Sequence, residues 1–310
     1  MEGMLPLRIG LIADIQHADL PDGQSDYGLV RHYRDAVNKA RMAAKDWTTQ
    51  KCAFAVNLGD TVDRRGGQGA SGALDSVLEA FGGFAPVIHI PGNHDLSALT
   101  EADLGKLRPG AAAPQPHVAR GPSSACEVCP PGSGWRVLVL DTYDVAVRRD
   151  EELARATLGR LLEDARRSGK SAPYLTQHSE LNGAVGEEQL EWLHGRLQAA
   201  SDARDRVVVL SHAPLRPDVT IYRDAVCWNW EQVNDLLESY PSTVAAVITG
   251  HDHHVGEVVS KRGIYHRVLE AAMEGAVGTP THAVLELSGT RISLQGRGGV
   301  RSWGRELARS

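Results

Sequence analysis

The sequence contains few cysteines, and those it has do not form a recognisable framework. Four occur in 310 residues, and only Cys126 and Cys129, in "CEVC", lie close together. No second CxxC and no nearby pair of histidines completes a four-ligand structural zinc site. We therefore expect free thiols, as in proteins of a reducing compartment.

Runs of like charge and apolar segments long enough to cross a membrane are also missing. The formal net charge is −6 without any run of like charges, which argues against nucleic acid as a partner. No apolar stretch is long enough to cross a bilayer. The start of the chain, "MEGMLPLRIGLIAD", has no basic region before its short apolar run. These absences predict a cytoplasmic protein with no membrane partner.

Six short apolar runs, with many β-branched residues, are spread along the chain. Each is of strand length and apolar almost throughout, which is typical of strands buried on both faces. The runs start at residues 7, 52, 86, 135, 206 and 245, and apolar residues at helical spacing occur over 27–47, 187–200 and 230–240. The pattern predicts an α/β fold with mixed sheets and helices over the outer faces.

Three segments depart from this rhythm. The tail from residue 263 to residue 298 alternates more strictly and predicts antiparallel strands. Residues 64–72, "RRGGQGASG", predict a Gly-rich loop, and residues 108–134 are rich in Pro, Gly and Ala. Because strand-type runs lie on both sides of the latter segment, we predict a single domain over 1–310 with a variable insertion around 100–135.

Residues of the kinds that bind metals follow five of the six predicted strands. They are Asp14 and Gln16, Asp60, Asn93 with His94, His212, and finally His251 with His253. Ligands of sheets with parallel strands bind outside the carboxyl ends of the strands, where the loops converge. We therefore expect these side chains to meet in one site.

This mixture of carboxylates, amides and imidazoles fits two divalent metal ions. A close pair of ions needs a bridging carboxylate, for which Asp60 in "LGDTVD" is the candidate. The set suits Mn²⁺, Fe or Zn²⁺ better than Ca²⁺ or an all-oxygen Mg²⁺ site. Two ions ~3.5–4 Å apart can lower the pKa of a bridging water and stabilise both oxygens of an in-line displacement. The residues thus predict dinuclear phosphoryl chemistry.

Five motifs occur in order between residues 14 and 253: "DIQ", "GDTVD", "GNHD", "SHAP" and "GHDH". In this order the chain resembles the calcineurin-like metallophosphoesterases. The resemblance implies a four-layer α/β/β/α sandwich, in which two mixed sheets pack together and helices cover them.

Most of that superfamily has histidine where this chain has Gln16. Glutamine there, together with "RHYR", "NGAVGEEQLEWL", "CWNW" and "GRG", resembles the manganese-dependent ADP-ribose/CDP-alcohol diphosphatases. The resemblance implies that Gln16 rather than His17 is the ligand and that Mn²⁺ is the ion. Strand geometry agrees, because residues two apart share a face, as Asp14 and Gln16 do.

The same resemblance assigns roles to the polar residues. One ion would be held by Asp14, Gln16, Asp60 and His253, and the other by Asp60, Asn93, His212 and His251. His94 would contact phosphate and protonate the leaving group, so His94 and Asp60 are the predicted catalytic residues. Asp63 is expected beside the ligands. Asp95 is expected either to orient His94 or to cap a helix.

Three further residues are predicted to contact the substrate. Arg31 and Arg34, three apart in the helical pattern, would share one face. A planar guanidinium suits phosphate, and the resemblance favours Arg31, with a surface position for the other arginine. Cys227 in "CWNW" is expected near the nucleotide end of the pocket, with a place in the core as the alternative.

Taken together, the residues and the resemblance predict a phosphohydrolase that acts on a small molecule. ADP-ribose would give AMP and ribose 5-phosphate, and CDP-choline or CDP-glycerol would give CMP and a phosphoalcohol. A phosphomonoesterase or cyclic-nucleotide phosphodiesterase is the first alternative, against which Gln16 argues. A metal-bound scaffold without turnover is the second, although no motif is missing.

Overall fold

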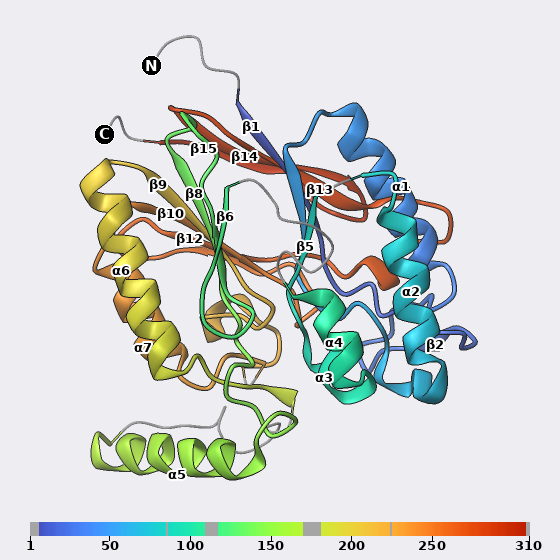
Figure 1. The fold of residues 1–310 in the computed structure, drawn as a ribbon, viewed down its shortest axis with the longest axis horizontal. Helices are drawn as coiled ribbons and strands as arrows, with labels where there is room; N and C mark the ends of the chain where they lie inside the picture. The colour runs from blue at the N-terminus through green and yellow to red at the C-terminus, as the bar shows by residue number, and fades with distance from the viewer. Residues whose placement is uncertain (1–5, 85, 109–116, 170–180, 224, 308–310) are drawn as a thin grey trace.

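Two β-sheets lie face to face at the centre of the computed structural model, which describes residues 6–84, 86–108, 117–169, 181–223 and 225–307 (Figure 1). Within that part of the chain, the first sheet has six strands in the order β15-β14-β13-β1-β4-β5. β1, β4 and β5 are parallel, whereas β13, β14 and β15 pair antiparallel. The strands are β1 (Leu7–Ile12), β4 (Phe54–Asn57), β5 (Val87–His89), β13 (Thr281–Leu287), β14 (Arg291–Gly298) and β15 (Trp303–Glu306).

The second sheet has seven strands among the described residues, in the order β11-β12-β10-β9-β8-β7-β6. Its four inner strands are parallel and its edge strands antiparallel. They are β6 (Val118–Arg120), β7 (Cys126–Val128), β8 (Trp135–Val139), β9 (Arg206–Leu210), β10 (Val244–Thr249), β11 (Glu257–Val259) and β12 (Tyr265–Val268). The prediction of antiparallel strands in the tail holds for β13 and β14, whereas β12 pairs antiparallel with β11 but parallel with β10.

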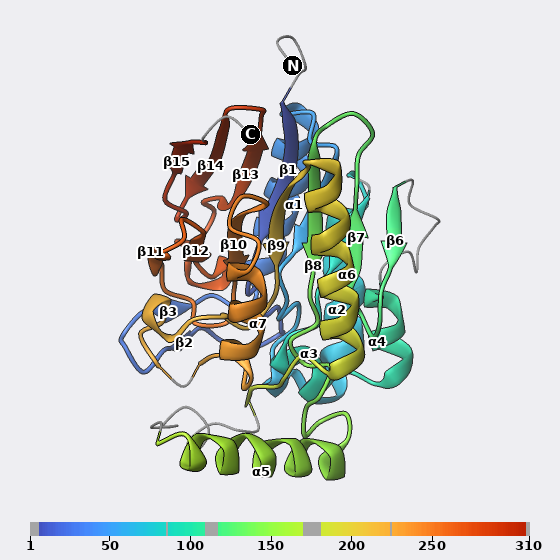
Figure 2. The ribbon, with the colours of Figure 1, turned by 90° about the vertical axis from the view of Figure 1, so that its left-hand side faces the viewer.

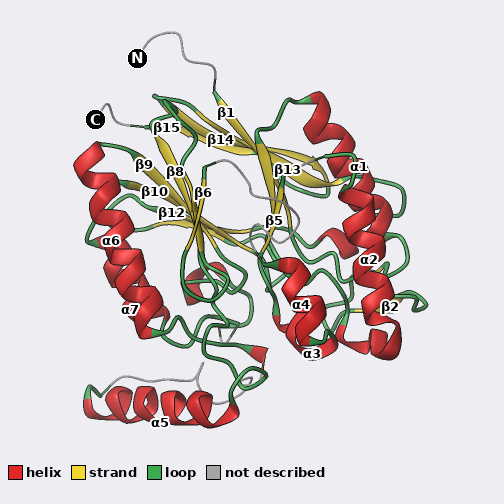
Figure 3. Ribbon diagram, viewed as in Figure 1, coloured by secondary structure: helices red, strands yellow, loops and turns green. Residues whose placement is uncertain are grey.

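Helices cover the outer faces of both sheets, as the sequence predicted (Figures 1 and 3). α1 (Ala36–Thr49) and α2 (Ala70–Phe81) lie over the first sheet, and α6 (Glu187–Ala203) and α7 (Trp230–Glu238) lie over the second. α6 buries Leu193, Leu197 and Ala200, which recur at helical spacing. The four-layer α/β/β/α sandwich is therefore confirmed.

Alternating side chains on each strand divide between two cores. Ile9 and Leu11 of β1 point between the sheets and are completely buried there with Val208 and Leu210 of β9. Ile12 belongs to the core beneath α1, which also contains the fully buried Trp47. Full burial of each such side chain stabilises the fold by ~1.5–3 kcal/mol. This packing gives the strand ends a rigid floor.

Two predicted elements differ from the structure. The helix expected over 27–47 begins only at Ala36, because residues 30–31 form β3 (Val30–Arg31), which pairs antiparallel with β2 (Gly23–Gln24). Residues 64–72 are not a simple loop: a 3₁₀ helix, η1 (Arg64–Gly69), leads into α2. The carboxylate of Asp63 accepts from Arg65 N–H and so caps η1.

Three further helices belong to the described fold. α3 (Asn93–Ala98) and α4 (Glu101–Leu107) follow β5, and α5 (Glu151–Arg167) lies apart from the sandwich (Figure 2). The single domain with an insertion around 100–135 stays a prediction. Of that segment, residues 109–116 lie outside the described residues, while β6 and β7 extend the second sheet. No helix among the described residues is long and apolar enough to cross a membrane.

Candidate metal centre

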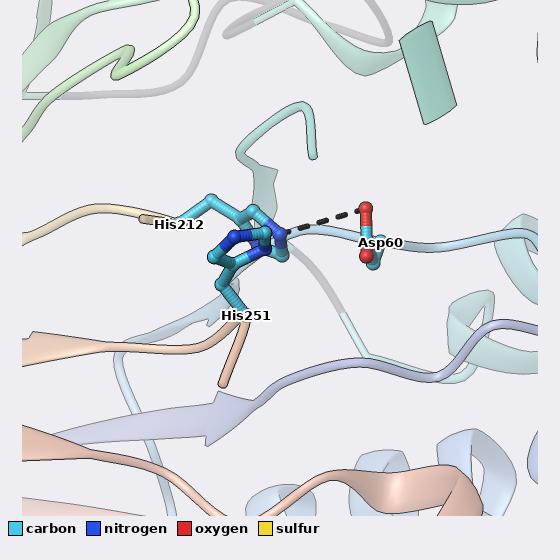
Figure 4. Close-up of side chains that lie close together, drawn as sticks. All are labelled: Asp60, His212 and His251. Atoms are coloured by element: carbon cyan, nitrogen blue, oxygen red, sulfur yellow. Dashed lines mark ion pairs between the residues drawn. The ribbon is translucent and has the colours of Figure 1, made fainter. Parts of the chain in front are cut away.

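Candidate ligands from both sheets meet at the carboxyl ends of the parallel strands. Asp60 follows β4, His212 follows β9 and His251 follows β10. One ligand atom from each of these three residues lies within 4.8 Å of the others (Figure 4). Figure 4 shows the two imidazoles side by side, with the Asp60 carboxylate facing them. Residues almost two hundred positions apart thus form one polar cluster.

Asp60 lies between two groups of candidate ligands. Its Oδ1 is 3.5 Å from His212 Nε2, which is in turn 3.4 Å from Asn93 Oδ1. Its Oδ2 accepts from Gln16 Nε2 at 3.1 Å. Because the two carboxylate oxygens face different groups, the geometry fits a carboxylate shared by two ions.

The second group is formed by residues that follow β1 and β10. His253 Nε2 lies 3.4 Å from Asp14 Oδ1 and 3.0 Å from Gln16 Nε2. Asp14, Gln16 and Asp60 are almost completely buried, and His253 is 8% exposed. Two carboxylates, an amide and an imidazole in so small a volume match the donor set that Mn²⁺ accepts.

Gln16 and His17 have different surroundings. His17 Nδ1 lies 2.9 Å from the Tyr33 carbonyl oxygen, and its backbone bridges to Val62. Gln16 is fully buried, and its Oε1 has no hydrogen-bond partner among the described residues. A half-turn of the amide would bring Oε1 to the place beside Asp60 and His253, where a cation can supply the missing partner. The surroundings of Gln16 therefore fit a metal ion.

The backbone at the site is strained. Among non-glycine residues, φ is positive at Asp14 (51°), Gln16 (43°), Asp60 (54°), His251 (73°) and His253 (65°). Left-handed conformations are uncommon for such residues and cost ~1–3 kcal/mol each where the surroundings impose them. Strain at five candidate ligands indicates that these loops adopt conformations that a metal-binding site requires, at a cost in stability.

Two glycines allow the ligand loops to approach one another. A Cβ on Gly92 would lie 2.1 Å from Asp60 Oδ1, and one on Gly59 would lie 2.3 Å from His212 Nδ1. Gly59 also has a φ of 110°. Any larger residue would push a candidate ligand away. This explains the glycines in "GDTVD" and "GNHD" by close contact.

Opposing charges set the pKa values of the histidines. Burial alone would lower the pKa of His212, but the Asp60 carboxylate outweighs it and raises the pKa to about 9. For His253 burial is likewise outweighed, here by Asp14 and Glu274, and the pKa rises to about 10. Burial and the neighbouring His212 hold the pKa of His251 well below its usual value. The carboxylates therefore attract positive charge into the site.

His94 is oriented by a backbone donor rather than by an aspartate. Its Nδ1 accepts from the Arg64 N–H at 3.2 Å, and Asp63 Oδ2, 3.3 Å away, has no hydrogen-bond partner among the described residues. Asp95 instead accepts from the N–H groups of Thr61, Val62 and Gly92 at 2.9–3.1 Å. Of the two roles expected for Asp95, orienting His94 is wrong and capping a helix is confirmed, because its Oδ2 accepts from the N–H of Gly92, the N-cap residue of α3. Burial and the nearby Asp60 raise the pKa of Asp95 to about 7.

A pocket of about 230 Å³ opens over the cluster. Its inner wall includes Asp60, Asn93, His94, His251 and His253, and its outer wall includes Tyr27, Arg31, Arg64 and Tyr222. Arg31 and Arg64 are thus placed where an anionic group beside the metal ligands would meet them.

The other two predicted substrate contacts do not line this pocket. Arg34 is exposed and donates from Nε to Asp19 Oδ1 at 2.6 Å. Arg31 and Arg34 do not share a helical face, because β3 contains the former and a turn the latter. Cys227 is fully buried, its thiol lies 3.2 Å from Asn229 Oδ1, and burial raises its pKa to about 12. Cys227 therefore belongs to the core beneath α6 and α7.

Glu274, Asn182 and Tyr143 contact candidate ligands and were not predicted; the Tyr143 hydroxyl lies 3.4 Å from Asn93 Oδ1. Glu274 Oε1 lies 2.9 Å from His253 Nδ1, and Asn182 Oδ1 lies 2.9 Å from His251 Nε2. Asn182 lies in "NGAVGEEQLEWL", which carries the resemblance but has no ligand spacing. Glu274 lies in the tail that was predicted to form antiparallel strands, and no motif surrounds it. The sequence therefore carried no chemical signal for either Asn182 or Glu274.

A polar cluster of this composition, on this sandwich, defines the class of dinuclear metallophosphoesterases. The chain belongs to the calcineurin-like phosphoesterase family, whose sequence profile matches residues 7–255. It is 32% identical over 306 residues to the manganese-dependent ADP-ribose/CDP-alcohol diphosphatase of Arabidopsis thaliana, with 94% of each chain covered. It is 33% identical to the protein of the same name from Oryza sativa subsp. japonica, covering 93% of this chain and 90% of that protein.

Solved structures agree on the fold. The crystal structure of a dimetal phosphatase from Danio rerio matches with a TM-score of 0.83 and 27% identity, over 98% of this chain and all of that chain. A purple acid phosphatase from yellow lupin matches with a TM-score of 0.61 at 12% identity, over 98% of this chain and 54% of that chain. The second likeness concerns the fold alone.

Proposed function

We propose that this protein is a manganese-dependent dinuclear hydrolase of nucleoside diphosphate conjugates. It cleaves the pyrophosphate bond of ADP-ribose, CDP-choline or CDP-glycerol, giving a nucleoside monophosphate and a phosphorylated sugar or alcohol. The observation that carries the proposal is Gln16, which lies between Asp60 and His253 and whose Oε1 has no partner within the part of the chain that the structure describes. The proposal is supported by relatives named for this activity, at 32–33% identity over almost the whole chain.

The two ions would share Asp60. One is assigned to Asp14, Gln16, Asp60 and His253, and the other to Asp60, Asn93, His212 and His251. When bound, two such ions supply Lewis-acid chemistry, lowering the pKa of a water and stabilising charge on the phosphoryl oxygens. The two groups of short contacts around Asp60 support this division.

The remaining chemistry falls to side chains of the pocket. His94 has its Nδ1 beside the Arg64 N–H and Asp63, with its Nε2 3.9 Å from Asp60 Oδ2. From there Nε2 can donate a proton to the leaving phosphate oxygen. Arg31 and Arg64, on the outer wall, hold the rest of the diphosphate by charge and hydrogen bonding.

A substrate panel tests this proposal. Metal-free protein is supplied with Mn²⁺, or Mg²⁺ in parallel, and offered ADP-ribose, CDP-choline, CDP-glycerol and a simple phosphomonoester. Nucleoside monophosphate and free phosphate are both followed. We expect AMP or CMP release that depends on Mn²⁺, with little phosphate from the monoester.

The other outcomes are equally informative. Phosphate release from the monoester, with the diphosphates left intact, would establish a phosphomonoesterase instead. Two bound ions without turnover of any substrate would favour a metal-bound scaffold.

A further inference from the structure

The segment that follows β12 is tied to the metal centre by its backbone. It begins with a 3₁₀ turn, η5 (Ala272–Glu274). Ala272 N–H donates to the Ala13 carbonyl at 2.9 Å, and Met273 N–H donates to the Asp14 carbonyl at 3.1 Å. η5 is therefore held against the strand end that carries Asp14.

A buried lysine fixes the same segment from the other side. Lys39 of α1 has no exposed surface, and its Nζ donates to the carbonyls of Gly275, Ala276 and Thr279 at 2.9, 2.8 and 3.3 Å. Its charge is balanced by Asp35 Oδ2 at 3.2 Å. Burial of an ammonium group is tolerated only with such complete pairing, so the backbone after Glu274 has little freedom.

The side chain that this arrangement holds in place is Glu274. Its Oε1 lies 2.9 Å from His253 Nδ1 and 3.1 Å from Arg31 Nε, and it also accepts from the Tyr27 hydroxyl. The side chain is 4% exposed. Oε2 is buried without a hydrogen-bond partner among the described residues. One carboxylate oxygen thus joins a candidate metal ligand to two residues of the pocket wall.

The contact with His253 decides which nitrogen faces the metal centre. A carboxylate can only accept, so the hydrogen that the neutral imidazole keeps when it ligates a metal is on Nδ1. Nε2, which lies beside Asp14 and Gln16, then presents its lone pair to that group. Carboxylates placed in this way orient histidine ligands and raise their basicity.

The contact between Glu274 and Arg31 orients a side chain that lines the pocket. Nε of Arg31 is engaged by Glu274, which holds the planar guanidinium in one orientation at the pocket wall. A guanidinium fixed in this way loses less rotational freedom when it binds phosphate.

We propose that Glu274 is a positioning residue that acts on both halves of the site at once. Through His253 it supports metal binding, and through Arg31 it orients the contact with the substrate's phosphate. The inference rests on the proposed function for its substrate half only, because metal binding is measured separately.

The test compares Glu274→Gln with Glu286→Gln. Glu286 is also bonded to an arginine, Arg8 at 2.9 Å, but at the opposite end of β1 from Asp14. Mn²⁺ affinity is measured by titrating metal-free protein and following free Mn²⁺ by electron paramagnetic resonance. We expect Glu274→Gln to weaken Mn²⁺ binding by about 10- to 100-fold, with Glu286→Gln within about twofold of the parent. Parent-like affinity in Glu274→Gln would overturn the metal half.

A double-mutant cycle tests the substrate half. Arg31→Gln should raise KM for the diphosphate and leave Mn²⁺ affinity within about twofold. Adding Glu274→Gln to Arg31→Gln should raise KM little further, measured with both sites saturated by Mn²⁺. Fully additive effects on KM would contradict a role through Arg31.

A folding control and a second variant separate a loss of positioning from a loss of folding. Thermal denaturation checks that each variant is folded, and Glu274→Asp, which keeps the charge but withdraws it by one methylene, replaces Glu274→Gln if the latter does not fold. The same weakening of Mn²⁺ binding is expected for it, and parent-like affinity would overturn the inference. If no diphosphate is cleaved even by the parent, the proposed function fails, while the Mn²⁺ titration still decides the role of Glu274.

Discussion

Gln16 and His17 are adjacent residues with opposite surroundings, and the difference can be tested at the scale of one residue. Gln16 has a buried amide oxygen that no described residue bonds, whereas His17 bonds to the Tyr33 carbonyl. We expect Gln16→Ala to weaken Mn²⁺ binding at least tenfold and to lower hydrolysis accordingly.

His17→Ala is the matched control, measured by the same Mn²⁺ titration. It should keep Mn²⁺ affinity within about twofold, since the ligand set is intact. The reverse ranking of the two variants would show that the first motif had been interpreted with the wrong ligand.

Proton release on metal binding is a second prediction at this scale. In the metal-free protein, the Asp60 and Asp14 carboxylates raise the pKa of His212 to about 9 and of His253 to about 10 against the effect of burial. Both imidazoles are thus protonated at pH 7 and must lose a proton to ligate. The affinity for each Mn²⁺ ion should therefore rise by about one decade per pH unit around neutrality, and the product of the two association constants by about two.

Calorimetry in buffers of different ionisation enthalpy measures this release. We expect about two protons for each pair of Mn²⁺ ions bound near pH 7. Affinity and heat that do not change with pH or buffer would mean that other residues hold the ions.

At the scale of elements, the junction between β5 and α3 depends on Gly92. A Cβ there would lie 2.1 Å from Asp60 Oδ1 and 2.5 Å from Asp60 N. Gly92→Ala should displace the shared carboxylate, destabilise the fold by ~1–3 kcal/mol and abolish high-affinity Mn²⁺ binding.

Gly159→Ala is the control for that change. Gly159 lies in α5, and a Cβ there would meet no atom of the described residues within 4 Å. It should stabilise the protein by ~0.5–1 kcal/mol and leave Mn²⁺ binding unchanged, as measured by urea denaturation and metal titration. Normal Mn²⁺ binding in Gly92→Ala would contradict the close approach seen here.

β5 also contains a histidine that makes stability depend on pH. Burial lowers the pKa of His89 to about 4, so the folded protein binds fewer protons there than the unfolded chain. The stability that His89 contributes is fully present above about pH 6.5, the ordinary pKa of histidine, and is lost as the pH falls to about 4. Over this range the free energy of unfolding should fall by roughly 3 kcal/mol. Urea denaturation of metal-free His89→Gln should therefore show a smaller loss over this range than the parent. The exposed His194→Gln should match the parent, and a parent-like slope in His89→Gln would refute the assignment.

Elements were predictable from the sequence where local pattern and tertiary packing agree. The six apolar runs correspond to β1, β4, β5, β8, β9 and β10, with β10 beginning one residue before its run, because strands buried on both faces need continuous apolar residues. The helix expected from residue 27 starts later, since residues 23–31 pair as the hairpin β2–β3 and His32 N–H bonds to the Met273 carbonyl. Such long-range pairing overrides helical spacing and leaves no local signal.

At the scale of the whole molecule, the candidate centre was predictable because its residues follow parallel strands. Asp60, His212 and His251 meet from both sheets, as the ordered motifs implied. Glu274 was not predictable, since it reaches the centre only through the backbone bonds of η5 and the carbonyl contacts of Lys39. The prediction that Arg31 and Arg34 share a helical face was also wrong, because long-range pairing places Arg31 in β3 and the helix starts only after Arg34.

The central claim is that Asp60 is shared by two ions whose joint presence permits hydrolysis. The most direct test adds Mn²⁺ stepwise to metal-free protein and records the paramagnetic resonance spectrum together with AMP release from ADP-ribose. We predict the multiline spectrum of an exchange-coupled pair at two equivalents, with activity rising along the same curve. Full activity at one equivalent, or two ions that remain magnetically uncoupled, would contradict the account.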